Sequence, residues 1–356
     1  MTGHIWVRAE QRPQERRVPV TPSGVAALME AGWRVTVEKC RTRAIPDAAF
    51  EATGCQMAAT GAWQEQATDD VYVVGLKELD SQVPDLRHRH IMFGHAFKGQ
   101  RDGSNLLKRF ARGGGTLLDL EYLTDTGGRR VAAFGYWAGF AGAAVALLAW
   151  RAQQMGRALG PVSAYDGQDA LAGAVHAALN RARPSLLVAG ARGRAGSGAV
   201  SLAASLNLPV TRLTVDTQAP GGTFQEVLQH EVFINCTLAR PGMPIFIDRD
   251  AIAQHRKLRV IGDVSCDPNS DYNPIAVYDK ASSFDEPVLN LGTARQPLDV
   301  VAIDNLPSLL PVESSTDYAD QLLPHLLTLK TDPDCVWRRA TAIFEANLAN
   351  LLGRSD

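Results

Sequence analysis

The stretch LLVAGARGRAGSGAV, residues 186–200, contains the pattern that decides the fold. An apolar run leads into four glycines within nine residues, from Gly190 to Gly198, and a segment of small residues follows. This composition predicts a buried strand, a turn too tight for Cβ atoms and the start of a helix. Such a turn directs backbone N–H groups and the positive helix end toward one point, where a phosphate can bind. The spacing is G-x-x-G-x-x-G-x-G rather than the regular dinucleotide fingerprint, so on this loop alone a glycine turn without a ligand stays open.

The composition is that of an ordinary globular protein with room for two domains. The chain has 356 residues, 46% of them hydrophobic and 21% charged, with a net charge of −2. A near-neutral charge without a long basic run argues against nucleic acid as the main partner. The 5 cysteines are scattered, without a CxxC motif or a Cys/His cluster at zinc spacing, so we expect no metal site and a reducing cytoplasm.

No segment predicts secretion or a membrane partner. The first residues lack a charged region followed by an apolar stretch. Residues 131–150 are uncharged but rich in Gly and Ala, which is typical of a buried helix rather than a membrane span. The sequence leaves the oligomeric state open.

Two sets of alternating strands and helices follow one another along the chain. In the first set we expect strands at residues 5–7, 33–37, 70–75, 91–93 and 117–118. In the second set we expect strands at residues 186–189, 210–215, 232–235, 259–264 and 300–303. Helices are expected at residues 136–157, 168–181, 316–329 and 337–352. The alternation predicts an α/β fold with two doubly wound, Rossmann-like domains, joined by long helices and separated by a cleft for cofactor and substrate.

Asp216 ends the second strand of the second set, 26 residues after Gly190. An acid at this place suits the two ribose hydroxyls of NAD and would repel the 2′-phosphate of NADP. An ordinary strand-end aspartate is the alternative. The glycine turn at the right distance favours the cofactor interpretation.

Lys77 and His95 each follow an apolar strand of the first set. Parallel neighbouring strands would place both at the carboxyl edge of one sheet, where α/β proteins build active sites. Burial lowers the pKa of a lysine and imidazole titrates near neutrality, so the two could exchange protons with a substrate amine. Glu78 and Glu15 are candidates to tune Lys77. Each base taken singly also suits a solvated loop, and both interpretations stay open at this point.

Several cations in the same region suit a substrate with several carboxylates. Guanidinium groups bind carboxylates bidentately, and the candidates are Arg17, Lys98, Arg129 and Arg130. Arg16 equally suits a solvated surface.

The segment 87–90 alternates arginine and histidine. We interpret it as an exposed turn and expect no metal at His88 and His90.

These residues resemble a known family along nearly the whole chain. The sequence resembles the lysine-forming, NAD-dependent saccharopine dehydrogenases, and more distantly the alanine dehydrogenase and transhydrogenase family. The motifs that carry the resemblance are ERR…TP at 15–22, GLKE at 75–78, HAFKGQ at 95–100, GTL…DLE at 115–121, GRRVAAFG…AGFAG at 128–142, GRAGSGA at 193–199, FINC at 233–236, DVS at 263–265 and DNLPSLLP at 304–311.

The resemblance implies roles at the matching positions. Lys77 and His95 would be the acid–base pair, with Glu78 and Glu121 tuning the charge around them. The implied substrate contacts are Arg17, Lys77, Lys98, Gln100, Arg130, Phe134 and Ser265. The implied NAD contacts are Arg129, Gly193, Arg194, Asp216, Val264, Ile303, Asp304, Asn305 and Leu306. We therefore expect a substrate and catalytic domain in residues 1–130 plus 318–356, and an NAD-binding domain in residues 131–317.

The resemblance also implies a reaction: saccharopine, NAD and water giving lysine and 2-oxoglutarate. Two alternatives are an alanine or other opine dehydrogenase, and a nucleotide-binding regulatory protein without turnover. Two positions depart from the family pattern. Ala195 stands where fungal members have a cysteine able to pair with the counterpart of Cys236, and Val312 stands where an arginine is expected.

Overall fold

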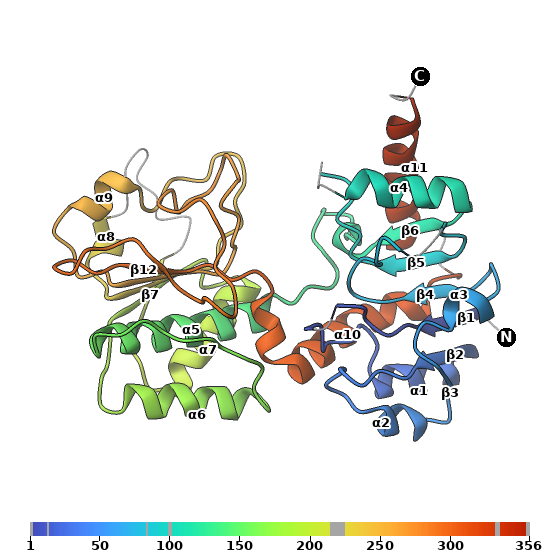
Figure 1. Ribbon diagram of the computed structural model, residues 1–356, viewed down its shortest axis with the longest axis horizontal. Helices are drawn as coiled ribbons and strands as arrows, with labels where there is room; N and C mark the ends of the chain where they lie inside the picture. Colours follow the sequence, from blue (N-terminus) through green and yellow to red (C-terminus); the bar gives the residue numbers. More distant parts are fainter. Residues whose placement is uncertain are drawn as a thin grey trace. The chain divides into compact units, whose positions relative to one another are not determined.

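The computed structural model describes residues 3–12, 14–82, 85–98, 102–213, 225–331 and 335–353. The chain forms two compact units, Met1–Ala133 with Ser314–Asp356, and Phe134–Glu313. Each unit contains one predominantly parallel sheet flanked by helices (Figure 1). The predicted α/β class with two Rossmann-like sheets is confirmed.

The first unit is built on a sheet whose described strands are all parallel, in the order β3-β2-β1-β4-β5-β6. This is the strand order of a doubly wound fold, with its direction of winding changing between β1 and β4. The strands are β1 (Gly3–Val7), β2 (Trp33–Glu38), β3 (Gln56–Ala58), β4 (Tyr72–Val74), β5 (Arg89–Met92) and β6 (Thr116–Asp119). The helices are α1 (Pro22–Glu30), α2 (Asp47–Glu51), α3 (Trp63–Gln66), α4 (Gly103–Gly113), the short 3-10 turn η1 (Leu120–Tyr122), α10 (Pro311–Leu327) and α11 (Val336–Leu352).

Local sequence signals set the limits of these helices. The Thr21 hydroxyl accepts the Gly24 N–H and Pro22 occupies the first turn, so α1 begins there. Gly114 ends α4 in the left-handed conformation, at φ +73°. Helix α10 begins at Pro311, five residues earlier than predicted from the apolar pattern, because a proline is well suited to a first helical turn.

The C-terminal helix α11 belongs to the core of the first unit. Phe344 packs edge to face on Phe110 of α4, with the ring centroids 5.5 Å apart. Both rings are buried with strand residues such as Trp6 and Leu117.

The second unit has the strand order β11-β12-β10-β9-β7-β8, in which the edge strand β11 is antiparallel and the others are parallel. The strands are β7 (Leu186–Ala189), β8 (Val210–Leu213), β9 (Val232–Asn235), β10 (Val260–Asp263), β11 (Leu289–Asn290) and β12 (Asp299–Val301). The helices are α5 (Gly135–Gln154), α6 (Gln168–Leu179), α7 (Arg194–Ser205), α8 (Gln225–Leu228), α9 (Arg249–Ala253) and the 3-10 turn η3 (Leu306–Leu309). Strands β7 and β9 have the predicted limits.

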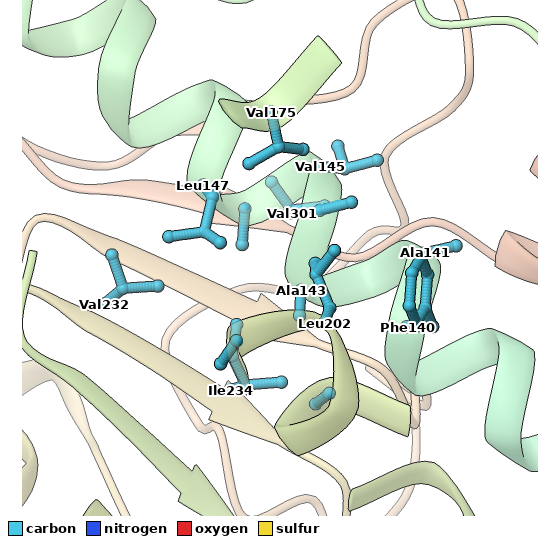
Figure 2. Packing of buried hydrophobic residues seen from close by; sticks show 14 of the residues in the cluster. Phe140, Ala141, Ala143, Val145, Leu147, Val175, Leu202, Val232, Ile234 and Val301 are labelled. Atoms are coloured by element: carbon cyan, nitrogen blue, oxygen red, sulfur yellow. The ribbon is translucent and has the colours of Figure 1, made fainter. Parts of the chain in front are cut away.

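Alternate residues of this sheet enter two separate cores. In β9, Val232 and Ile234 face α5, α6 and α7, whereas Phe233 packs on the opposite face with Phe246. Figure 2 shows the first of these cores, with Val232 and Ile234 beneath the side chains of α5. A strand buried on both faces is apolar throughout, as expected for a parallel sheet.

Helix α5 packs closely because its small residues let backbones approach. A Cβ atom on Gly139 would lie 1.7 Å from the Ala195 carbonyl oxygen, and one on Gly198 would lie 1.9 Å from the Tyr136 carbonyl oxygen. Gly142 has no room for a Cβ beside Val264, at 2.7 Å. The Gly/Ala-rich segment is therefore a buried helix, as predicted, and among the described residues no helix is long and apolar enough to cross a membrane.

The prediction of an exposed turn at residues 87–90 is wrong. Residues 89–92 form β5, and His88 and His90 are 1% and 0% exposed. Their rings lie edge on to Trp63, with centroids 5.5 and 5.0 Å away, while the guanidinium of the exposed Arg89 lies 5.4 Å from the ring centroid of Tyr72. The alternation of arginine and histidine is the two-residue period of a strand with one buried face.

Candidate active site

Lys77, His95 and Asp119 come together at the carboxyl edge of the first sheet. Lys77 follows β4, His95 follows β5, and Asp119 is the last residue of β6. The register pairs Val74 with Ile91 and Met92 with Asp119, so the three strands end at the same level. This edge includes the β1–β4 position where the winding changes direction, the usual ligand site of such sheets.

Lys77 is largely buried and His95 is half-buried beside it. Lys77 is 8% exposed. Burial, and next the positive charge of Lys77, lower the pKa of His95 below its ordinary value. This shift favours the neutral form of the ring, which can act as a base.

The backbone of His95 lies in the left-handed region, at φ +48°. This conformation is strained for a residue with a Cβ and occurs preferentially at functional sites. The ring stacks on Phe93 with an interplanar angle of 17°, and its Nδ1 atom lies 3.3 Å from Glu78 Oε2. These contacts fix the ring orientation.

A buried carboxylate holds Arg17. Both side chains are 3% exposed, and Arg17 donates from Nε and Nη2 to the two oxygens of Glu15, at 2.8 and 2.7 Å. Burial raises the pKa of Glu15, but the hydrogen bonds and charge of Arg17, with the charge of Lys77, bring it below its ordinary value. The guanidinium of Arg17 therefore has a fixed orientation. It lies close enough to Lys77 that the positive charges of both residues act on Glu15.

Glu121 lies beside two of the cationic side chains that are predicted to bind substrate. Lys98 Nζ donates to Glu121 Oε1 at 2.7 Å, and Arg130 Nη2 lies 4.0 Å from the same oxygen. Burial raises the pKa of Glu121, but Lys98 and Arg130 bring it below its ordinary value. The negative charge of Glu121 also raises the pKa of His95, so the charges of Glu121, Lys98, Arg130 and His95 influence one another.

Asp119 is a buried acid that the sequence patterns did not assign to the site. Its carboxylate accepts the N–H of Gly94 at 3.2 Å and that of Glu121 at 2.9 Å. Burial raises the pKa of Asp119 to about 6, against the effect of those hydrogen bonds. Asp119 thereby fixes the backbone on either side of the group that surrounds His95.

The glycine residues of the second unit form the predicted tight turn between β7 and α7. Gly190 has φ +71°, and the Gly193 N–H donates to its carbonyl oxygen at 2.9 Å. A Cβ on Gly196 would lie 2.1 Å from the same oxygen. The turn therefore requires glycine, and Arg194 begins the 12-residue helix α7 directly after it.

A buried polar network follows β9 and β10 in this unit. Asp263 accepts hydrogen bonds from the Asn235 amide at 2.9 Å, the Tyr278 hydroxyl at 2.6 Å and the Ser265 N–H at 3.2 Å. The Ser265 hydroxyl donates to the Thr237 carbonyl oxygen. The network fixes the backbone of 263–265, where Val264 and Ser265 are predicted contacts.

The predicted cofactor residues of the second unit lie around α5. Gly142 leaves no room for a Cβ beside Val264 and Leu306, at 2.7 and 3.1 Å, and the Cβ of Arg194 is 3.1 Å from the corresponding position at Gly135. Asn305 adopts φ +65° and starts the turn η3. Asp304 accepts the Asn305 N–H at 2.9 Å, and Ile303 is buried just before it.

Other predicted residues are less closely associated. Arg129 is on an exposed hairpin of the first unit, with its side chain 86% exposed and paired to Asp125 at 3.0 Å. Phe134 is the residue before α5, in the second unit. Gln100 and Asp216 lie outside the described residues, and their roles stay predictions.

The departure at Ala195 agrees with the state of the cysteines. Cys236 is a free thiol, half-buried next to the glycine turn. Within the described ranges, no three His, Cys, Asp or Glu side chains converge as a metal site would require.

The sequence patterns also missed Arg8 and Glu10. Arg8 is 2% exposed and donates to the Lys77 carbonyl oxygen, and Glu10 accepts the Lys77 N–H at 3.0 Å. The available signal was a pair of opposite charges directly after an apolar strand, because charges are costly to bury unless they are paired and hydrogen-bonded.

The two sheets and the glycine turn define an α/β fold of the dinucleotide-binding kind. The family described as "Alanine dehydrogenase/PNT, N-terminal domain" matches residues 6–141. The solved structure of an L-alanine dehydrogenase has the same fold, with a TM-score of 0.70 at 17% identity, covering 98% of this chain and 99% of that one.

Full-length relatives narrow this class. A protein of Emericella nidulans named saccharopine dehydrogenase (NAD(+), L-lysine-forming) is 40% identical over 369 residues, covering 98% of both chains. One of the same name from Yarrowia lipolytica is 41% identical over 362 residues, again covering 98% of both. The chain belongs to the family of NAD(+)-dependent, L-lysine-forming saccharopine dehydrogenases.

Proposed function

We propose that this protein is an oxidoreductase that converts saccharopine, NAD and water to lysine, 2-oxoglutarate and NADH. The observation that carries the proposal is the pair Lys77 and His95, at neighbouring strand ends, in a chain that matches the L-lysine-forming relatives over 98% of its length. The family accounts for the substrate. The pair accounts for the chemistry, because cleaving a secondary amine needs more proton transfers than oxidising an alcohol.

The glycine turn fits a dinucleotide. A pyrophosphate needs close approach to backbone N–H groups, and Cβ atoms at Gly190 and Gly196 would close the turn, at 2.9 Å from Cys236 O and 2.1 Å from Gly190 O. Gly193 and Arg194 would hold the pyrophosphate at the start of α7, with Val264 and residues 303–306 along the rest of the cofactor. When bound, NAD oxidises the glutamate-side carbon of saccharopine, next to the secondary nitrogen.

Lys77 and His95 then carry the proton transfers. Lys77 accepts the proton of the substrate amine as the carbon is oxidised to an imine. One of the pair next removes a proton from the water that adds to the imine carbon. The same pair protonates the lysine nitrogen and removes the proton of the added hydroxyl as the carbon–nitrogen bond breaks, which leaves the carbonyl group of 2-oxoglutarate. The lowered pKa of His95 suits the base step, because it favours the neutral ring that accepts a proton.

The surrounding cations suit the carboxylates of saccharopine. Arg17 is preoriented by the two hydrogen bonds that it donates to Glu15, and Lys98 and Arg130 share Glu121. Guanidinium groups held in this way bind carboxylates with little further loss of side-chain freedom. Gln100, Phe134 and Ser265 complete the predicted substrate contacts.

The test follows the absorbance of NADH with saccharopine, alanine and other opines as substrates. We expect turnover with saccharopine, and losses of about 100- to 10,000-fold in kcat for Lys77→Met and for His95→Gln. Gly173→Ala, on an exposed turn of α6, is the matched control and keeps wild-type kcat.

Two results would contradict the proposal. Turnover of alanine but not of saccharopine would assign a different substrate, and wild-type rates in both variants would remove the acid–base roles. A preference for NADPH over NADH would separately overturn the role predicted for Asp216.

A further inference from the structure

The backbone of Lys77 is held through both its N–H and its carbonyl group. Arg8 donates from Nη2 to the Lys77 carbonyl oxygen. Glu10 accepts the Lys77 N–H through Oε2 at 3.0 Å and the Leu76 N–H through Oε1 at 2.6 Å. Arg8 Nη1 lies 3.5 Å from Glu10 Oε2, so the two holding groups are themselves an ion pair.

Arg8 and Glu10 are buried and closely packed against the chain that follows β4. The side chains of Arg8 and Glu10 are 1% and 4% exposed. A Cβ on Gly75 would lie 2.4 Å from Arg8 Cζ, so the chain leaving β4 runs directly against the guanidinium. Hydrogen bonds from charged groups are the strong ones in such surroundings, and they are also directional.

We propose that Arg8 and Glu10 are positioning residues that set the direction of the Lys77 side chain. The inference rests on the proposed function only in giving Lys77 its role as a base. The Lys77 amine is at the end of a flexible four-carbon chain, so a small rotation of its peptide moves the amine by a large part of a hydrogen-bond length. Displacement by about 1 Å can lower a rate about 100-fold.

The pKa of His95 depends on the position of the Lys77 ammonium group, and it can be measured without following turnover. The charges that act on its ring are Lys77 and Arg12, which lower its pKa, and Asp119 and Glu121, which raise it; Glu78 lies beside Nδ1. Removing the negative charge of Glu10 has a direct effect of one sign only, a lower His95 pKa. Moving the Lys77 ammonium away has the opposite effect, a higher His95 pKa.

The experiment compares Glu10→Gln with Glu38→Gln. Glu38 is also a buried acid at a strand end, 1% exposed, and accepts the Trp6 indole N–H at 3.1 Å and the N–H of Trp63 at 3.0 Å. It also accepts the N–H of Ala9 at 3.0 Å and that of Gly61 at 2.9 Å, and none of these four hydrogen bonds involves the backbone of Lys77. Arg8→Lys is the second variant, because it keeps the charge and loses the guanidinium fork.

In the full-length protein, the His95 pKa is followed by NMR titration, with the ring signal assigned by its absence in His95→Gln. Saccharopine turnover and NADH binding are measured on the same samples. We expect Glu10→Gln and Arg8→Lys to raise the His95 pKa and to lower kcat by about 30- to 100-fold, with an unchanged Kd for NADH. Glu38→Gln should lower Tm and leave kcat within about twofold, because a structural role alone affects the folded fraction.

A His95 pKa that stays unchanged or falls in both Glu10→Gln and Arg8→Lys overturns the inference, whatever the rates. If wild-type protein does not turn over saccharopine, the proposed function is wrong, and the NMR titration still decides whether Arg8 and Glu10 position Lys77. Should Glu10→Gln fail to fold, Arg8→Lys gives the decisive titration, since it leaves the net charge unchanged.

Discussion

The carboxyl edges of the two sheets are built in opposite ways. At the edge of the first sheet, side chains of opposite charge hold one another, as Glu15 holds Arg17 and Glu121 holds Lys98. At the edge of the second sheet, glycines bring backbones together, as Gly196 does beneath Gly190. The difference matches what each edge is proposed to bind: a substrate that exchanges protons and carries several carboxylates, and a pyrophosphate held by N–H groups.

The two constructions also differ in what a mutation can do. A glycine contact has no alternative, because the neighbouring atom is backbone and cannot turn away. An ion pair tolerates change in proportion to its exposure, since water replaces a lost partner at the surface and cannot do so in the interior. The loss of unfolding free energy on substitution should therefore increase with burial in the first unit. In the second unit it should increase as the distance to the nearest backbone atom becomes shorter.

The largest effect is expected from Gly139→Ala in α5. Its new Cβ would lie 1.7 Å from the Ala195 carbonyl oxygen, so α5 and α7 must separate. We expect a loss of unfolding free energy above about 4 kcal/mol, the range of severe overpacking, measured by urea denaturation. Gly173→Ala is the matched control: it is also a helical glycine, nothing lies within 4 Å of its new Cβ, and it should gain about 0.5 to 1 kcal/mol. Equal stability of the two variants would show that contact distance does not set the cost of a substitution in the second unit.

The sequence predicted the second unit better than the first, because the second is built from patterns that are local in the chain. Glycine turns and apolar strands are local patterns, so β7 and β9 were located with the observed limits. The chemical pair in the first unit was also visible, because Lys77 and His95 directly follow apolar strands.

What could not be predicted depends on contacts far apart in the chain. Arg8 meets the Lys77 peptide 69 residues later, and neither sequence segment indicates the other. His88 and His90 appear polar in sequence but are covered by Trp63, which comes from an unpredicted short helix. Asp119 likewise appears as an ordinary strand end, and only its burial makes it a group that titrates near pH 6.

An intermediate effect is expected from Asp119→Asn, and it depends on pH. The folded state raises the pKa of Asp119 from 3.8 to about 6, so the folded protein binds its proton more tightly than the unfolded chain does. The stability from this proton is fully present below about pH 4 and is lost as the pH rises through about 6. The loss amounts to about 3 kcal/mol for a shift of this size.

Urea denaturation at pH 4 and pH 7.5 measures this dependence. The difference in unfolding free energy, Asp119→Asn minus wild type, should be more favourable to the variant at pH 7.5 by about 3 kcal/mol. The hydrogen bonds from Gly94 and Glu121 favour the ionised carboxylate, and the net shift of the Asp119 pKa to about 6 already includes their effect. A difference that does not change with pH would show that Asp119 is ionised without penalty, and burial would then not grade the effects in this unit.

The smallest effect is expected from Asp85→Asn, and it isolates exposure from geometry. Asp85 pairs with Arg112 at 2.7 Å, the same distance that joins Glu15 to Arg17, but its pair is 48% and 59% exposed rather than 3% and 3%. We expect Asp85→Asn to change the unfolding free energy by less than about 0.5 kcal/mol and Glu15→Gln to lower it by about 3 kcal/mol. In 1 M NaCl the effect of Asp85→Asn should disappear while that of Glu15→Gln persists, because salt screens exposed charges far more than buried ones. Since the N–O distances are equal, a comparable loss in the two variants would mean that distance rather than burial sets the strength of ion pairs in the first unit, and its contrast with the glycine contacts of the second would no longer hold.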